Sequence, residues 1–155
     1  KVIEIDPNYI AAYYNRGKAK SKLKDYYGAI ADYIKVIEID PNYIDAYYNR
    51  GKAKSKLKDD YGAIADYTKA IEIDPKYIDA YYNRGGLKQD LKDDYGAIAD
   101  YTKAIEIDPN NVGAFINRGI SKERLGNLNG ACADWKKAAE LGNTDAAKWV
   151  ANDCN

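Results

Sequence analysis

Small and hydrophobic residues recur along this chain three and four positions apart, which is the spacing of one face of an α-helix. In the block from Ile10 to Tyr43 the first series of such positions is Ala12, Tyr13, Gly17, Ala19 and Leu23. The polar pair Lys24-Asp25 interrupts the pattern, and a second series follows at Ala29, Ile30, Tyr33, Val36, Ile37 and Ile39. The pattern predicts two helices of roughly 12–15 residues with a short turn between them, in which Asp25 caps the second helix.

The whole block repeats with a fixed period. An Asp-Pro pair stands every 34 residues, at Asp6-Pro7, Asp40-Pro41, Asp74-Pro75 and Asp108-Pro109. The block from Ile44 to Tyr77 differs from the block from Ile78 to Asn111 at only six positions. A period of about 20–50 residues is typical of proteins built from stacked repeats. We expect each Pro to end the helix before it and each Asp to cap the helix after it.

One glycine stands in the middle of each predicted first helix, at Gly17, Gly51, Gly85 and Gly119. Glycine inside a helix costs about 1 kcal/mol relative to alanine, so a cost taken four times indicates a gain in packing. The second helices offer Ala29, Ala63, Ala97 and Ala131. We expect each glycine to face the alanine of its own repeat, so that the two helices approach closely.

A 34-residue helix pair with Tyr13, Gly17, Ala29, Tyr33 and Pro41 at these offsets resembles the tetratricopeptide repeat (TPR) family. The resemblance implies an all-α fold, a right-handed superhelix (solenoid) of helix-turn-helix repeats. It divides a single TPR domain, residues 1–155, into four repeats at 10–43, 44–77, 78–111 and 112–145. Residues 1–9 are then the remnant of a preceding repeat, which leaves an uncapped N-terminal face, and residues 146–155 form a C-terminal capping helix.

The repeats depart from the family at two positions. Arginine stands where the family usually has leucine, at Arg16, Arg50, Arg84 and Arg118, and lysine stands where it usually has an aromatic residue, at Lys20, Lys54, Lys88 and Lys122. An arginine on an inward face must keep its charged end hydrated or paired. We expect the arginine stems to pack on the aromatic residues and their guanidinium groups to bond Asp32, Asp66, Asp100 and Asp134 of the second helices.

Composition excludes several function classes. The 24 basic and 24 acidic residues balance, which argues against a nucleic-acid partner and against a polybasic membrane surface. No apolar run approaches the length of a membrane span. Without any His, and with carboxylates that repeat in every copy, the sequence indicates no enzyme active site, no metal site and no cofactor. The chain begins inside a repeat and resembles a piece of a longer protein; its compartment stays open, with the cytoplasm favoured.

Two cysteines, Cys132 and Cys154, are too few for a disulfide framework. Cys132 takes the position of an isoleucine in the other repeats, so we expect it to be buried and reduced. A bond to Cys154 requires the last helix to fold back over Cys132.

The resemblance implies that the first helices line a concave groove that binds an extended peptide. In the first two repeats the groove positions that we select as candidate ligand contacts are Tyr14, Asn15, Lys18, Lys22, Tyr48, Asn49, Lys52 and Lys56. In the last two they are Tyr82, Asn83, Gln89, Ile116, Asn117, Ile120 and Arg124. The asparagines form a ladder, one in each repeat, whose amides can pair with a peptide backbone. The lysines favour acidic residues of the peptide, and the isoleucines favour an apolar one.

Other interpretations of these residues stay open. The asparagines and tyrosines can instead satisfy neighbouring helices, the lysines can form a solvated face, and the two isoleucines can fill the core. In TPR proteins that bind chaperone tails, a set of Lys, Arg and Asn holds a C-terminal carboxylate, and here Tyr14, Asp79 and Asn83 replace its cations. Binding of such a tail is therefore not expected.

The sequence thus predicts a protein–protein interaction scaffold that binds an extended segment of a partner protein. Two alternatives are a repeat module that self-assembles into a homo-oligomer through the uncapped N-terminal face, and the interaction arm of a larger multidomain enzyme.

Overall fold

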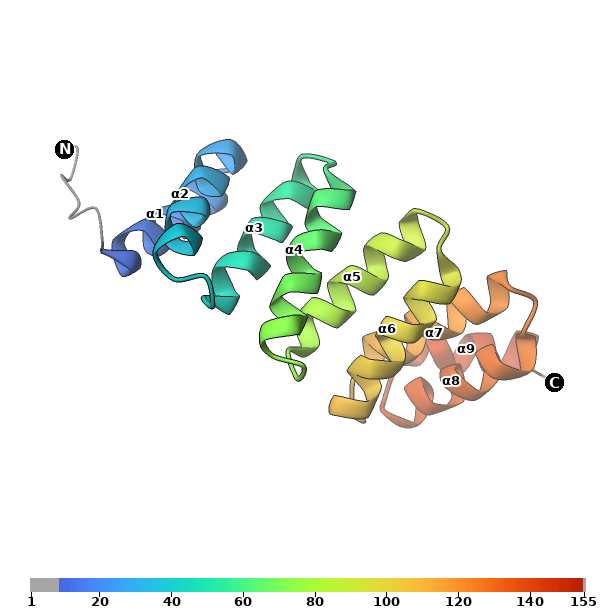
Figure 1. The fold of residues 1–155 in the computed structure, drawn as a ribbon. Coiled ribbons are helices and arrows are strands. Elements are labelled where there is room, and N and C mark those ends of the chain that lie inside the picture. Colours follow the sequence, from blue (N-terminus) through green and yellow to red (C-terminus); the bar gives the residue numbers. More distant parts are fainter. Residues whose placement is uncertain (1–8, 155) are drawn as a thin grey trace. The chain divides into compact units, whose positions relative to one another are not determined.

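The computed structural model describes residues 9–154, and all its regular elements in this range are α-helices (Figure 1). They fall into two compact units, one ending at Pro75 and the other beginning at Lys76. The first unit holds α1 (Ile10–Lys22), α2 (Tyr26–Ile39), α3 (Ile44–Lys56) and α4 (Asp60–Ile73). The second holds α5 (Ile78–Asp90), α6 (Asp94–Ile107), α7 (Val112–Arg124), α8 (Leu128–Glu140) and α9 (Thr144–Asp153). The all-α prediction is confirmed, with two helices in each predicted repeat; the remnant predicted at residues 1–9 lies almost wholly outside the described residues.

The two kinds of turn arise from different residues. Between the helices of one repeat, Asp25 caps α2 as predicted, because its carboxylate accepts a hydrogen bond of 2.9 Å from the Gly28 amide. Between repeats the prediction is half wrong. Asp40 ends α2, but its carboxylate accepts from the Asn42 amide at 2.9 Å instead of capping α3, which begins three residues after Pro41 without a side-chain cap. Asp-Pro therefore shapes the turn and does not start the next helix.

All four repeats share one packing feature: a tyrosine or tryptophan of the second helix packs against the glycine of the first helix. A Cβ atom added at Gly17 would lie 2.8 Å from Cε1 of Tyr33, and one at Gly51 would lie 2.8 Å from Cε1 of Tyr67. The nearest atoms belong to the aromatic ring and not to the predicted alanine. At Gly51 the carbonyl oxygen of the predicted Ala63 is also close, at 3.3 Å, but in both repeats the glycine first makes room for a ring that is itself buried.

The predicted arginine–aspartate pairs are confirmed in all four repeats. Arg16 donates from Nε and Nη2 to the two carboxylate oxygens of Asp32, at 2.9 and 2.6 Å, and the guanidinium lies 5.4 Å from the centre of the Tyr13 ring. Lys20 adds an ion pair of 2.9 Å to the same carboxylate. Burial tends to raise the pKa of Asp32, but the hydrogen bonds from Arg16 and Lys20 outweigh it and hold that pKa below its ordinary value. The same triad recurs at Asp66, Asp100 and Asp134.

The expectation of reduced cysteines is wrong. Cys132 in α8 and Cys154, just after α9, form a disulfide whose Cα atoms lie 5.6 Å apart. The last helix folds back onto α8, and Trp149 packs on Trp135 with ring centres 5.5 Å apart. Cys132 is buried, as predicted. The sequence could not supply the pairing because it depends on where α9 docks.

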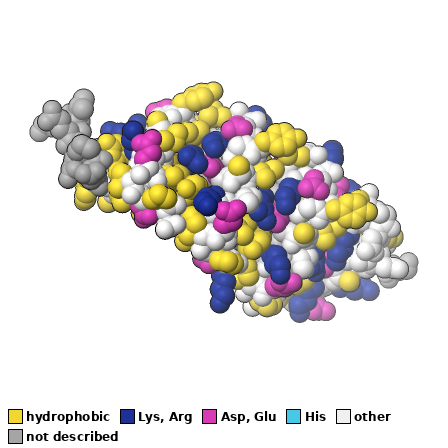
Figure 2. All heavy atoms as spheres, viewed as in Figure 1, with side chains coloured by type: hydrophobic (Ala, Val, Ile, Leu, Met, Phe, Trp, Pro, Cys, Tyr) yellow, Lys and Arg dark blue, Asp and Glu magenta, His cyan; other side chains and the backbone are white. Residues whose placement is uncertain are grey.

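Charge is mixed on the visible face of the molecule. On the face shown in Figure 2, Lys and Arg side chains lie among Asp and Glu side chains and form no continuous stripe. Within residues 9–154, no helix is both long and apolar enough to cross a membrane.

Candidate peptide-binding pocket

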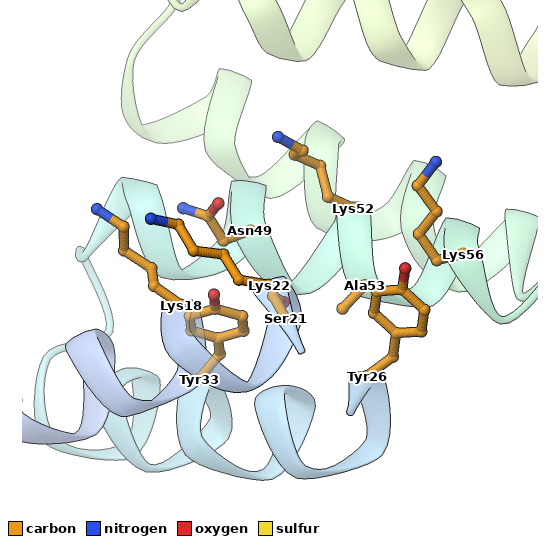
Figure 3. A pocket seen from close by; sticks show the side chains of 9 residues that line it. All are labelled: Lys18, Ser21, Lys22, Tyr26, Tyr33, Asn49, Lys52, Ala53 and Lys56. Atoms are coloured by element: carbon orange, nitrogen blue, oxygen red, sulfur yellow. The ribbon is translucent and has the colours of Figure 1, made fainter. Parts of the chain in front are cut away.

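A pocket of about 340 Å³ opens between α1, α2 and α3 of the first unit (Figure 3). It brings together several of the residues selected from the sequence. Its lining consists of Lys18, Ser21, Lys22, Tyr26, Tyr33, Asn49, Lys52, Ala53 and Lys56. In Figure 3 the lysine side chains and the hydroxyl groups of Tyr26 and Tyr33 point to the same side of the helices.

Four lysines give the pocket its charge. Lys18 and Lys22 lie one turn apart on α1, and Lys52 and Lys56 repeat that arrangement on α3. Two of them lie over aromatic rings, with Nζ of Lys18 and of Lys52 each 5.4 Å from the ring centre of the tyrosine one turn earlier. Such contacts favour a cation but do not cancel its charge. No lining residue is acidic, and none of the four lysines has a carboxylate within ion-pair distance among residues 9–154.

Three side chains that carry hydroxyl groups line the pocket. Tyr33 is buried, and burial raises the pKa of its hydroxyl while a hydrogen bond with Ser21 acts in the opposite direction. Tyr33, Tyr26 and Ser21 line the pocket together with the four lysines. Tyr26 was missed at the sequence level. The signal was present, because the other repeats carry Asp60, Asp94 and Leu128 at this register and only the first carries tyrosine.

The asparagine ladder is partly engaged within the fold. Asn49 donates from Nδ2 to the Tyr14 hydroxyl at 3.2 Å and to the Asp45 carbonyl at 2.8 Å, so both its amide hydrogens have partners. Burial, followed by the charge of Asp45, raises the pKa of Tyr14 to about 12. In the second unit, Asn117 donates to the Tyr82 hydroxyl at 3.1 Å. These bonds correspond to the interpretation in which asparagine satisfies a neighbouring helix, and contacts to a peptide through the amide oxygen stay a prediction.

The remaining ladder residues differ in exposure. Asn15 is exposed on α1, and Asn83 donates to the Asp79 carbonyl at 2.7 Å. Tyr48 packs on Tyr67, with ring centres 5.8 Å apart. Each of these side chains is on a first helix, as predicted, but only Asn49 of the ladder lines the pocket.

In the second unit, side chains bond to one another at the equivalent place. Gln89, at the register of Ser21, donates to the Ser121 hydroxyl at 2.9 Å and to the Asn117 carbonyl at 3.1 Å. Arg124, at the register of Lys56, lies 3.6 Å from the carboxylate of Asp94. In the second unit, hydroxyl and charged groups at this place are therefore bonded to nearby side chains, whereas in the first unit such groups line an open pocket.

The two selected isoleucines pack inward. Ile116 and Ile120 are half-buried against the core of the last repeat, which includes Phe115, Trp135 and Ala146. This placement fits the interpretation as core residues, and leaves their outer edges as the predicted apolar contact. Among residues 9–154 no group of three or more His, Cys, Asp or Glu side chains could hold a metal ion.

Sequence profiles of one family cover most of the chain. Profiles described as "TPR repeat" and "Tetratricopeptide repeat" match residues 22–58, 44–77, 78–111 and 100–133, a continuous stretch from 22 to 133. The chain belongs to the tetratricopeptide repeat family. Its all-α TPR fold, and the resemblance inferred from the repeat, are thereby confirmed.

Solved TPR structures resemble it along most of its length. A crystal structure of MamA is 29% identical with a TM-score of 0.87, over 94% of this chain and 85% of that one. MamA 41-end from Desulfovibrio magneticus RS-1 is 25% identical with a TM-score of 0.79, over 86% and 76%. The first TPR of Spaghetti (RPAP3) bound to the HSP90 peptide SRMEEVD is 27% identical with a TM-score of 0.73, over 80% and 98%. Comparison with curated proteins gave no match.

Proposed function

We propose that this TPR chain is an interaction scaffold that binds an extended, acidic segment of a partner protein at the pocket between α1 and α3. The observation that carries the proposal is the set of four lysines around an open pocket with no carboxylate among its lining residues. Acidic side chains of a peptide would supply the missing counter-charges. Attraction of this kind strengthens where cations line a concave surface, because its low-dielectric walls focus their electric field.

A structural neighbour supports the class of ligand. The RPAP3 repeat domain is described with a peptide, SRMEEVD, that is rich in acidic residues. The details differ in this chain, because Tyr14, Asp79 and Asn83 stand where the resemblance implies cations that hold a C-terminal carboxylate. We therefore assign the pocket to acidic residues within a segment and not to a chain end.

The first-helix face of the second unit carries the proposed apolar and polar contacts. Ile116 and Ile120 offer their outer edges, while Asn83, Asn117 and Gln89 supply amide groups. Arg124 is already near Asp94, so we expect it to contribute less than the lysines of the first unit.

The test is a binding comparison in the full chain. Fluorescence anisotropy with pools of extended acidic peptides should detect binding that weakens strongly in the Lys18→Glu, Lys52→Glu double variant. The loss should be largest at low salt, because exposed charges are screened within about 10 Å at 0.1 M salt.

The matched control is Lys35→Glu with Lys69→Glu. It makes the same change in net charge on second helices, at lysines already paired with Glu38 and Glu72. If the pocket variant and the control bind acidic pools as well as the wild type does, the pocket is not the site.

The disulfide bears on the compartment. Disulfides persist in oxidising compartments and are rare in the cytosol. We infer that the Cys132–Cys154 bond favours an oxidising compartment, whereas the sequence alone favoured the cytoplasm. Alkylation of free thiols in protein taken directly from its source, without reductant, checks this: labelling of both cysteines would restore the cytoplasmic expectation.

A further inference from the structure

The lysine quartet is confined to one pair of repeats, although the scaffold around it is shared by all. Lys18 and Lys22 are replaced by Gly86 and Asp90 in the third repeat, and the fourth has Ile120 at the register of Lys18. The lysines of the scaffold triads, in contrast, recur in all repeats and have carboxylate partners, as Lys20 has Asp32. A charged group that repeats with its partner is structural. The quartet instead appears once, and within residues 9–154 none of its lysines has a carboxylate partner.

The pocket holds more positive charge than one carboxylate can balance. Four lysine side chains line this pocket of about 340 Å³, and none of its lining residues is acidic. Coulomb energy is proportional to the product of the charges, so a ligand group of about −2 is attracted to each lysine about twice as strongly as a carboxylate at the same distance. A phosphorylated side chain carries about −1.5 to −2 at pH 7 and presents three strong acceptor oxygens.

The neutral donors of the pocket suit the same group. Tyr26 and Ser21 line the pocket together with the lysines, and Figure 3 shows the Tyr26 hydroxyl directed to the side on which Lys56 lies. Hydroxyl groups and lysines together suit a phosphoryl group better than a carboxylate, because three charged acceptor oxygens can accept from more of these donors than two can. The Tyr26 position is decisive, since the second and third repeats carry an aspartate there that would repel an anion.

The rest of the surface argues against a polynucleotide. A nucleic acid needs a run of cations along its phosphates. The positions in the second unit that correspond to the quartet are Gly86, Asp90, Ile120 and Arg124, and basic and acidic residues balance over the chain. The geometry therefore fits one isolated phosphoryl group.

We propose that the pocket between α1 and α3 binds the phosphoryl group of a phosphorylated serine or threonine in the partner segment. This inference rests on the proposed function, because it specifies which residue of the acidic segment the pocket selects. Lys18, Lys22, Lys52 and Lys56 neutralise the dianion, and Tyr26 donates to one of its oxygens. Phosphorylation of the partner then switches its binding on.

The experiment uses the full chain and three fluorescent peptide pools. The pools share an acidic composition and differ only at the central position, which is phosphoserine, glutamate or serine. We expect the phosphoserine pool to bind about tenfold more tightly than the glutamate pool. In the Lys22→Gln, Lys56→Gln variant the phosphoserine preference should disappear, and inorganic phosphate should displace the phosphoserine pool from the wild type.

One control variant and three possible outcomes test the inference. Lys35→Gln with Lys69→Gln changes the net charge equally and should keep the preference. Equal binding of the phosphoserine and glutamate pools, both weakened by the pocket variant, would overturn the phosphoryl proposal and leave the proposed function standing. Binding of no pool would overturn both. Tight, lysine-dependent binding to phosphatidylinositol phosphate vesicles without preference for the phosphoserine pool would also overturn the inference, because the site would then serve a lipid surface.

Discussion

The first and second units share one scaffold but differ in the side chains that lie between consecutive first helices. Both contain the aspartate triads and the buried ring packed against glycine. In the first unit the place between consecutive first helices is an open pocket lined by lysines, whereas in the second Gln89 and the Arg124–Asp94 pair occupy it. The second unit is further tied by α9 and the disulfide. In a repeat array, therefore, the shared positions maintain the fold, and specificity can arise at the positions that differ between copies.

The triads should show the largest effect, and it should differ between the first and the last repeat, because Arg16 is more exposed than the arginine of any other triad. Asp134 accepts from Arg118, whose side chain is 15% exposed and also donates to Thr102 at 3.0 Å. Removal of the carboxylate in Asp134→Ala leaves two poorly hydrated cations, and we expect a loss of about 3 kcal/mol in the free energy of unfolding. Asp32→Ala should cost only about 1 kcal/mol, because Arg16 is 43% exposed and water replaces its partner.

Urea denaturation followed by circular dichroism measures both variants. Equal losses of unfolding free energy in the two variants would mean that the exposure of the arginine does not determine how much each triad stabilises the protein.

The disulfide should give the next largest effect, confined to the second unit. It closes a loop with a sequence separation of 22, so its removal should cost about 3 kcal/mol through the entropy of the unfolded chain. Both tryptophans of the protein, Trp135 and Trp149, lie in contact in this unit. Reduction should therefore lower the unfolding midpoint seen by tryptophan fluorescence.

The Cys132→Ala, Cys154→Ala variant is the control, and its midpoint should not respond to reductant. A wild type that is equally indifferent to reductant would show that the bond does not hold α9 in place.

The side chain that closes the second unit gives a smaller, directed test. Gln89→Ala removes the donor to the fully buried Ser121 hydroxyl, and an unsatisfied buried group of this kind costs about 1–2 kcal/mol. The change at the same register of the first unit, Ser21→Ala, should cost less, because Ser21 lines the pocket and is only half-buried, so water can enter the space that its hydroxyl leaves. Thermal unfolding of the two variants compares them, and a larger loss in Ser21→Ala would contradict the contrast between open and closed places.

The parts of the structure that were predictable share a physical reason. Helix positions, the Asp25 cap and the Arg16–Asp32 pair depend on local spacing that four copies repeat, so each signal was read four times. The outcomes that sequence reasoning missed depend on docking. The disulfide needed the position of α9, and Tyr26 joined the pocket only because α2 and α3 meet beside it. The ligand contacts proposed for Asn15 and Ile120 stay predictions, because the fold alone does not test them.

The mildest difference lies in the turn within each repeat. Both turns of the first unit place a lysine in the left-handed region, Lys24 at φ 63° and Lys58 at φ 64°, whereas the last repeat has Gly126 at φ 79°. This conformation destabilises a residue with a Cβ atom by about 1 kcal/mol in the folded state. Glycine avoids that cost, but roughly half of the gain is lost because glycine has more conformational entropy in the unfolded chain. Lys58→Gly should therefore stabilise the protein by about 0.5 kcal/mol, and Gly126→Lys should destabilise it by a similar amount. Lys58→Ala keeps the unfavourable backbone while it removes the charge, so a gain in that variant equal to the gain in Lys58→Gly would assign the effect to the lysine side chain and not to the turn.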